Sequence, residues 1–156
     1  MMQRVSDNVA MPVSDLFAFL EGNWQLSRTI NDISQNMPGV MSGRVAITRR
    51  GDTQGNPALS YREEGELQFG NYRETVHRAY EFSFPEANRA LVHFSDGRIF
   101  HELDLSSGFC EVEHQCENDV YRGRFQAVDG DVWLSNWDIS GPAKDLILDN
   151  RYQRLL

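Results

Sequence analysis

The strongest pattern in this chain is the alternation of apolar and polar residues over short stretches. A period of two residues is typical of β-strands that bury one face, and it runs from about residue 23 to the end of the chain. Turn-forming pairs such as Asp96-Gly97 and Asp129-Gly130 separate the stretches. The pattern predicts strands near 23–31, 40–49, 58–68, 71–83, 89–95, 98–105, 109–117, 120–128, 131–139 and 145–154.

A short helix is predicted before the first strand. Ser14 suits its N-cap, residues 16–20 form an apolar body, and Gly22 follows its end. Ten sequential strands with tight turns favour an up-and-down antiparallel β-barrel over a β-sandwich, because a sandwich needs long crossing connections. We therefore expect an all-β chain in which 1–156 form a single barrel domain of about ten strands, with a loosely ordered N-terminal arm over 1–12.

The predicted hairpin over 89–105 indicates which side chains face the barrel interior. A two-residue loop pairs Phe94 with Ile99 and places His101 in the middle of the inward face. The next strand alternates between outward glutamates and inward residues, so His114 is also expected inside. The inward face of the hairpin then comprises Ala90, Val92, Phe94, Ile99, His101, Leu103 and Leu105.

Alternation on the other strands places Arg28, Arg78 and Tyr121 inside the barrel as well. An isolated charge in a dry interior costs several kcal/mol, so each arginine needs a partner. One interpretation is a hydrated structural network with an internal carboxylate such as Glu63. The other is a ligand with an acidic head group, because arginine forms strong, directional hydrogen bonds to carboxylates in an apolar pocket.

The charge balance narrows the range of partners. The chain has 156 residues, with 15 Lys and Arg against 23 Asp and Glu, and a formal net charge of −8. This sign argues against nucleic acid and anionic membranes. The sequence shows no secretory leader and no apolar stretch of about 18 residues, so we expect a cytoplasmic protein. Cys110 and Cys116 lie about 20 Å apart on one predicted strand and, since a disulfide spans roughly 7 Å at most, are expected to be free thiols.

No established catalytic motif is present: there is no Gly-x-Ser-x-Gly, His-Glu-x-x-His, glycine-rich phosphate loop or Cys-x-x-Cys. His101, His114 and Cys116 carry atoms that zinc or copper binds, but their spacing matches no metal motif. We therefore expect no metal and no other cofactor. Acid–base chemistry by His101 and His114 inside the barrel is a separate possibility.

Gly22-Asn23-Trp24 on the first predicted strand and Arg154 on the last resemble the signature of the calycin superfamily, which includes lipocalins, fatty-acid-binding proteins and nitrobindin-like proteins. The resemblance implies that Gly22 and Trp24 belong to the closed floor of the barrel and that Arg154 packs across it. Nitrobindin-like proteins hold haem through a histidine late in the chain. Here the last histidine is His114, so haem is not expected.

A second set of motifs is spread over nearly the whole chain. It comprises residues 94–105 (FSDGRIFHELDL), His114-x-Cys116, Asp119-x-Tyr121-x-Gly123-x-Phe125, Trp137, Gly141-Pro142-x-Lys144 and Tyr152-x-Arg154. These motifs resemble an uncharacterised bacterial family, DUF6314. That family has no assigned activity, so the resemblance implies an architecture and leaves the function open.

We expect the barrel to bind a small, partly hydrophobic, anionic ligand through Arg28, Arg78, His101, His114 and Tyr121. Two alternatives remain. One is a lyase- or isomerase-like enzyme that uses His101 and His114. The other is a non-catalytic interaction scaffold with a filled barrel, which works through its surface or as a homodimer.

Overall fold

A computed structural model describes residues 4–6, 9–53 and 55–156 of the chain. The strands lie within a few residues of their predicted bounds, and a 3-10 turn, η2, follows the first of them. The elements are α1 (Leu16–Leu20), β1 (Gly22–Asp32), η2 (Ile33–Gln35), β2 (Met37–Thr53), β3 (Asn56–Phe69), β4 (Tyr72–Glu86), β5 (Arg89–His93), β6 (Ile99–Asp104), β7 (Phe109–Cys116), β8 (Asp119–Asp129), β9 (Val132–Ser140) and β10 (Asp145–Arg154).

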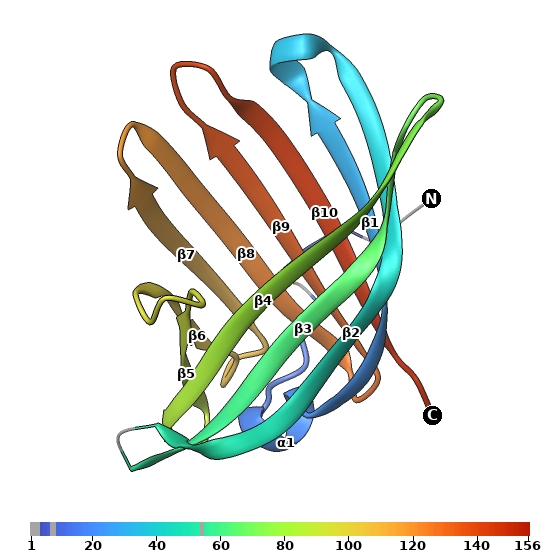
Figure 1. The fold of residues 1–156 in the computed structure, drawn as a ribbon. Helices are drawn as coiled ribbons and strands as arrows, with labels where there is room; N and C mark the ends of the chain where they lie inside the picture. Colours follow the sequence, from blue (N-terminus) through green and yellow to red (C-terminus); the bar gives the residue numbers. More distant parts are fainter. Residues whose placement is uncertain (1–3, 7–8, 54) are drawn as a thin grey trace.

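The ten strands form one antiparallel sheet in the order β6-β5-β4-β3-β2-β1-β10-β9-β8-β7 (Figure 1). Consecutive strands pair with each other except β6 and β7, and β1 also pairs with β10, so the meander curls into a barrel. Strands β6 and β7 form the two ends of the sheet and lie side by side. The prediction of an all-β, up-and-down barrel of ten strands is confirmed, and the barrel is nearly closed.

Helix α1 covers one end of the barrel (Figure 1). It begins after Asp15 and not after Ser14, and Asp15 Oδ1 accepts a hydrogen bond of 3.0 Å from the Ala18 backbone N–H. The expectation for the N-cap was therefore wrong by one residue, because Asp and Ser satisfy a free helix N–H equally well. Leu16 and Leu20 are fully buried and fill the end at which β1 begins. None of the described helices is long and apolar enough to cross a membrane.

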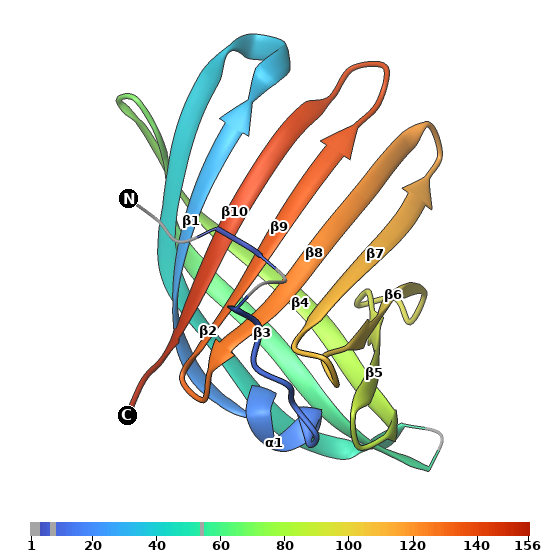
Figure 2. The same ribbon diagram turned by 180° about the vertical axis from the view of Figure 1, so that it is seen from behind.

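Residues 4–6 and 9–11, which precede α1, run across the outer face of β8–β10 (Figure 2). The Met11 N–H donates to the Ala127 carbonyl at 2.8 Å, and the Ser6 N–H donates to Gln126 Oε1 at 2.7 Å. Residues 1–3 and 7–8 of the arm expected over 1–12 lie outside the described residues. This segment buries outward-facing side chains such as Leu134, so β9 is buried on both faces along much of its length.

The β5–β6 hairpin differs from its prediction. The Phe94 N–H donates to the Arg98 carbonyl at 2.9 Å, so the loop has three residues, with its last residue, Gly97, at φ +92°. The longer loop shifts the register, and Phe100 forms a bulge that returns His101 to the inward face. Ile99 is therefore 54% exposed, against the expectation, and Phe100 is turned inward and is only 8% exposed.

Candidate functional site

A cavity of about 550 Å³ lies inside the barrel, toward the end away from α1. Side chains from β1, β2, β3 and β10 make one half of its wall largely aliphatic, and residues from β4 through the β5–β6 hairpin to β9 make the other half largely aromatic. A narrower hollow of about 40 Å³ continues toward α1 and has room for water. The residues shared by both spaces are Arg28, Glu63, Arg78, Tyr80, Phe100 and Trp137.

A buried polar network forms the bottom of the larger cavity. Arg28 and Glu63 are 6% and 4% exposed and make a bidentate ion pair, with N–H···O distances of 3.0 and 3.1 Å. Arg28 Nε also donates to Asn150 Oδ1. The Tyr61 hydroxyl donates to Glu63 Oε1 at 2.6 Å and lies 2.9 Å from the Tyr152 hydroxyl. Arg28 is thus engaged by partners of its own chain.

The charges in this network stabilise one another. Burial acts to raise the pKa of Glu63, but the nearby Arg28 charge and its hydrogen bonds outweigh burial and hold the pKa below its ordinary value. Burial acts to lower the pKa of Arg28, and Glu63 raises it above its ordinary value. Burial also raises the pKa of Tyr152 to about 12. At neutral pH the network therefore holds one cation, one anion and neutral phenols.

Arg78 adds a further positive charge next to this network. It lies directly opposite Glu63 in the β3–β4 ladder, and it lines the cavity. Both oxygens of Glu63 already accept hydrogen bonds from Arg28. Arg78 makes no ion pair with any carboxylate in the described part of the chain. The group formed by Arg28, Glu63 and Arg78 therefore carries one net positive charge, which lies on Arg78, an exposed residue at the wall of the cavity.

His101 and His114 both lie on the aromatic side but do not form a direct pair. Phe100 packs against both rings, with centroid distances of 4.8 Å to His101 and 5.2 Å to His114. His101 Nδ1–H donates to the Glu102 carbonyl at 2.8 Å. Burial lowers the pKa of His101 to about 4, so this imidazole is neutral at pH 7. His114 is half-buried and lines the larger cavity, whereas His101 lines the narrow hollow.

Tyr121 lies opposite His114 in the β7–β8 ladder and lines the larger cavity. Lys144 Nζ is 5.9 Å from the Tyr121 ring centroid and 3.4 Å from an Asp119 carboxylate oxygen. Cys116 is exposed and lines the same space, and both cysteines are free. Within residues 4–6, 9–53 and 55–156, no three His, Cys, Asp or Glu side chains are grouped so that they could hold a metal ion.

The floor of the barrel contains the residues singled out by the calycin resemblance. The Arg154 guanidinium lies 4.2 Å from the Trp24 ring centroid and donates to the Phe19 and Glu21 carbonyls at 2.8 and 3.1 Å. Gly22 has φ +139°, and a Cβ on it would lie 3.0 Å from Arg154 Nη1. Glycine is therefore favoured here by both backbone conformation and close approach.

Sequence reasoning missed the tyrosine and amide partners of the polar network and the inward position of Phe100. Alternation on β3 does place Tyr61 on the same face as Glu63, so that signal was available. The bulge that turns Phe100 inward has no comparable local signal. The inward residues that the structure adds are Tyr61, Phe100, Ser135 and Asn150.

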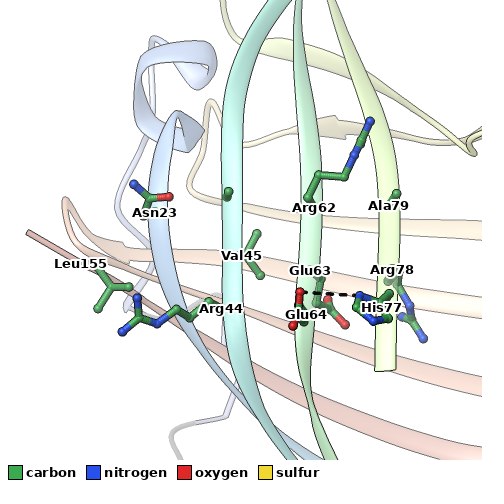
Figure 3. Close-up of a pocket in the computed structure, with 11 residues that line it drawn as sticks. Asn23, Arg44, Val45, Arg62, Glu63, Glu64, His77, Arg78, Ala79 and Leu155 are labelled. Carbon is green, nitrogen blue, oxygen red and sulfur yellow. Dashed lines mark ion pairs between the residues drawn. The ribbon is translucent and has the colours of Figure 1, made fainter. Parts of the chain in front are cut away.

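A second hollow, of about 620 Å³, lies on the outer side of β2, β3 and β4 (Figure 3). Arg44, Arg62, Glu64 and His77 are all exposed there, and the His77–Glu64 contact is long, at 3.8 Å. Solvated charges of both signs contribute little to the binding of a small molecule. The interior cavity is more enclosed and is lined by a larger share of apolar residues, and it is therefore the better candidate site.

Solved structures with a similar fold include a phycobiliprotein lyase, a protein of unknown function and a redesigned barrel. The S-type phycobiliprotein lyase CPES from Guillardia theta aligns with a TM-score of 0.69 at 12% identity over 94% of each chain. A DUF3598-family protein of unknown function from Nostoc punctiforme gives 0.59 at 13% identity over 94% of this chain and 51% of that chain. The redesigned barrel mFAP1, bound to DFHBI, gives 0.50 at 14% identity over 90% of this chain and 100% of that one.

At these identities the likeness shows the fold alone, and it agrees with an antiparallel β-barrel. No curated protein matches the sequence. A family model does match, because residues 20–154 fit the family of unknown function DUF6314. This match spans all ten strands, and the chain therefore belongs to the DUF6314 family.

Proposed function

We propose that the protein binds a small, partly apolar anion in its interior cavity. The observation that carries the proposal is the charge of the cavity lining. It contains four cationic side chains, Arg28, Arg78, Arg98 and Lys144, and one carboxylate, Glu63, although the whole chain carries a net charge of −8. An acidic protein that gathers cations around an apolar space is suited to attract and hold an anion there.

Arg78 is the cation best placed to contact the ligand. Arg28 is held by a buried carboxylate, and Arg98 and Lys144 are each paired with an aspartate, at 2.8 and 3.4 Å. Arg78 has no such partner among the described carboxylates, and it lies at the junction of the two interior spaces. An acidic group bound beside Arg78 would neutralise the net charge of the polar network, and its apolar body would fill the space toward the open end.

Apolar burial and one charged contact supply the expected affinity. Burial contributes ~25 cal/mol per Å² of apolar surface. A hydrogen bond to a charged group contributes about 1.5–3 kcal/mol, so loss of Arg78 should weaken binding roughly 10- to 100-fold. The redesigned barrel bound to DFHBI supports the idea that a barrel of this kind has room for a small molecule.

Native mass spectrometry of freshly purified protein, followed by denaturing extraction, tests the proposal. We expect a co-purifying anion whose occupancy falls in Arg78→Met. Arg73→Met is the matched control, because Arg73 is exposed like Arg78 and lies on the same strand but does not line the cavity, so its loss should leave occupancy unchanged. Empty wild-type protein that also fails to bind carboxylate probes would refute the proposal.

The two alternative functions differ from binding in measurable ways. A lyase- or isomerase-like enzyme should lose turnover in His114→Ala while it retains ligand. A scaffold should tolerate Arg78→Met and bind nothing in its barrel, and the cavity of about 550 Å³ argues against a barrel filled by its own side chains. The proposed binding requires neither haem nor metal. Free cysteines are compatible with a reducing compartment, and we propose a cytoplasmic location.

A further inference from the structure

We infer that the ligand is a flat, conjugated anion rather than a flexible fatty acid. This inference rests on the proposed function and narrows it to one chemical class. Six of the 21 residues that line the cavity are Phe, Tyr or Trp, whereas these types make up 11% of the chain. The cavity is thus far richer in aromatic side chains than the protein as a whole.

All of these aromatic residues except Phe69 form a rigid wall, because their rings pack against one another. Phe94 and Phe100 have centroids 4.6 Å apart and an interplanar angle of 20°, and Phe100 and Trp137 are 5.0 Å apart at 15°. Phe100 is therefore clamped on both faces by neighbouring rings. Tyr121 adds an edge-to-face contact with Phe100, at 6.0 Å and 87°. Interlocked rings of this kind do not move aside to follow a bending alkyl chain.

Such a wall interacts specifically with another π-system. Aromatic pairs in offset or edge-to-face geometry gain electrostatic attraction in addition to apolar burial, which an alkyl chain does not provide. The opposite half of the wall is aliphatic, with Ile30, Leu67 and Leu146, and it can cover the second face of a flat ring system. The site therefore resembles a slot with one aromatic and one aliphatic side.

The cations at this site also favour a conjugated anion. The Arg98 guanidinium lies 5.5 Å from the Phe94 ring centroid, and Lys144 lies beside Tyr121 at the other side of the aromatic half. A guanidinium is planar and stacks on ring systems as well as pairing with carboxylates. Arg98 and Lys144 are each paired with an aspartate, so Arg78 supplies the uncompensated positive charge beside the aromatic half. A ligand with an acidic substituent on an aromatic framework would interact with both the aromatic wall and the cations.

Three probes of similar carbon number test the inference by calorimetry or fluorescence titration. Pyrenecarboxylate is flat and anionic, palmitate is flexible and anionic, and pyrenemethanol is flat and neutral. We expect pyrenecarboxylate to bind at least tenfold more tightly than each of the other two. Arg78→Met should weaken pyrenecarboxylate at least tenfold, with folding checked by circular dichroism.

Phe94→Leu separates the aromatic wall from simple apolar burial, since Phe94 is only half-buried and its loss should not unfold the barrel. It should weaken pyrenecarboxylate at least fivefold and change palmitate binding less than twofold. Tight, Arg78-dependent binding of palmitate with weak binding of pyrenecarboxylate would overturn the inference and leave anion binding intact. If neither anion binds in the cavity, the proposed function itself fails.

Discussion

The substitution Glu63→Gln tests whether the buried ion pair holds the barrel interior together. Arg28 and Glu63 are nearly inaccessible to solvent and share two hydrogen bonds of 3.0 and 3.1 Å. Removal of the carboxylate charge leaves the guanidinium buried without a counter-charge, which costs about 3–5 kcal/mol in comparable sites. For a chain of 156 residues, Tm falls about 2–4 °C per kcal/mol, so a decrease of about 6–20 °C is expected.

Urea denaturation followed by tryptophan fluorescence gives the free energy of unfolding for this comparison. Glu64→Gln is the matched control, because Glu64 is the next residue, its side chain is 70% exposed and its contact with His77 is 3.8 Å long. The control should change stability by less than about 0.5 kcal/mol. A double variant, Arg28→Met with Glu63→Leu, removes both charges and should recover much of the loss. If Glu63→Gln proves no more harmful than Glu64→Gln, Arg28 does not depend on Glu63 and the reasoning is wrong.

Three further predictions concern pH, the barrel floor and the thiols. Burial lowers the pKa of His101 to about 4, so the folded state binds fewer protons than the unfolded chain between pH 4 and about pH 6.5. The free energy of unfolding should therefore fall by up to about 3 kcal/mol as the pH drops through this range. A urea midpoint that does not change with pH would contradict this prediction. His101→Gln should remove most of that slope. Gly22→Ala should lower the free energy of unfolding, measured by thermal denaturation, by about 1–3 kcal/mol. Gly51→Ala is the control and should leave stability nearly unchanged, because no atom lies within 4 Å of an added Cβ there. Equal effects of the two substitutions would argue against a strained barrel floor. A thiol reagent should label Cys116 quickly and Cys110 slowly, because burial raises the pKa of Cys110, and equal rates would disprove this difference.

Much of the fold could be predicted from the local alternation of apolar and polar residues. A strand with one buried face alternates every two residues whatever its partners, and this period identified all ten strands and their order along the chain. The pattern was less informative for β9, where Leu134 and Trp133 are both buried. The reason is tertiary: the segment before α1 covers the outer face of the sheet at this point (Figure 2).

The candidate site was only partly predictable. Alternation placed Arg28 and Arg78 on inward faces but gave no basis for distinguishing them. The structure separates their roles, because Glu63, 35 residues from Arg28 in sequence, engages that guanidinium and leaves the exposed Arg78 at the cavity wall without a carboxylate partner among the described residues. Such a pairing depends on how three strands are aligned across the barrel, and no local pattern encodes that alignment.

The sequence by itself determined the class of fold, the number of strands and the residues available to the interior, because backbone geometry ties these to short-range periodicity. Only the tertiary structure decided which polar residues neutralise one another and how the aromatic side chains stack. The β5–β6 hairpin shows the difference most directly. One extra loop residue and one bulge turned Phe100 inward, where it packs between His101 and His114. Contacts between strands that are distant in sequence stabilise this arrangement, because the burial of the Phe100 ring depends on them.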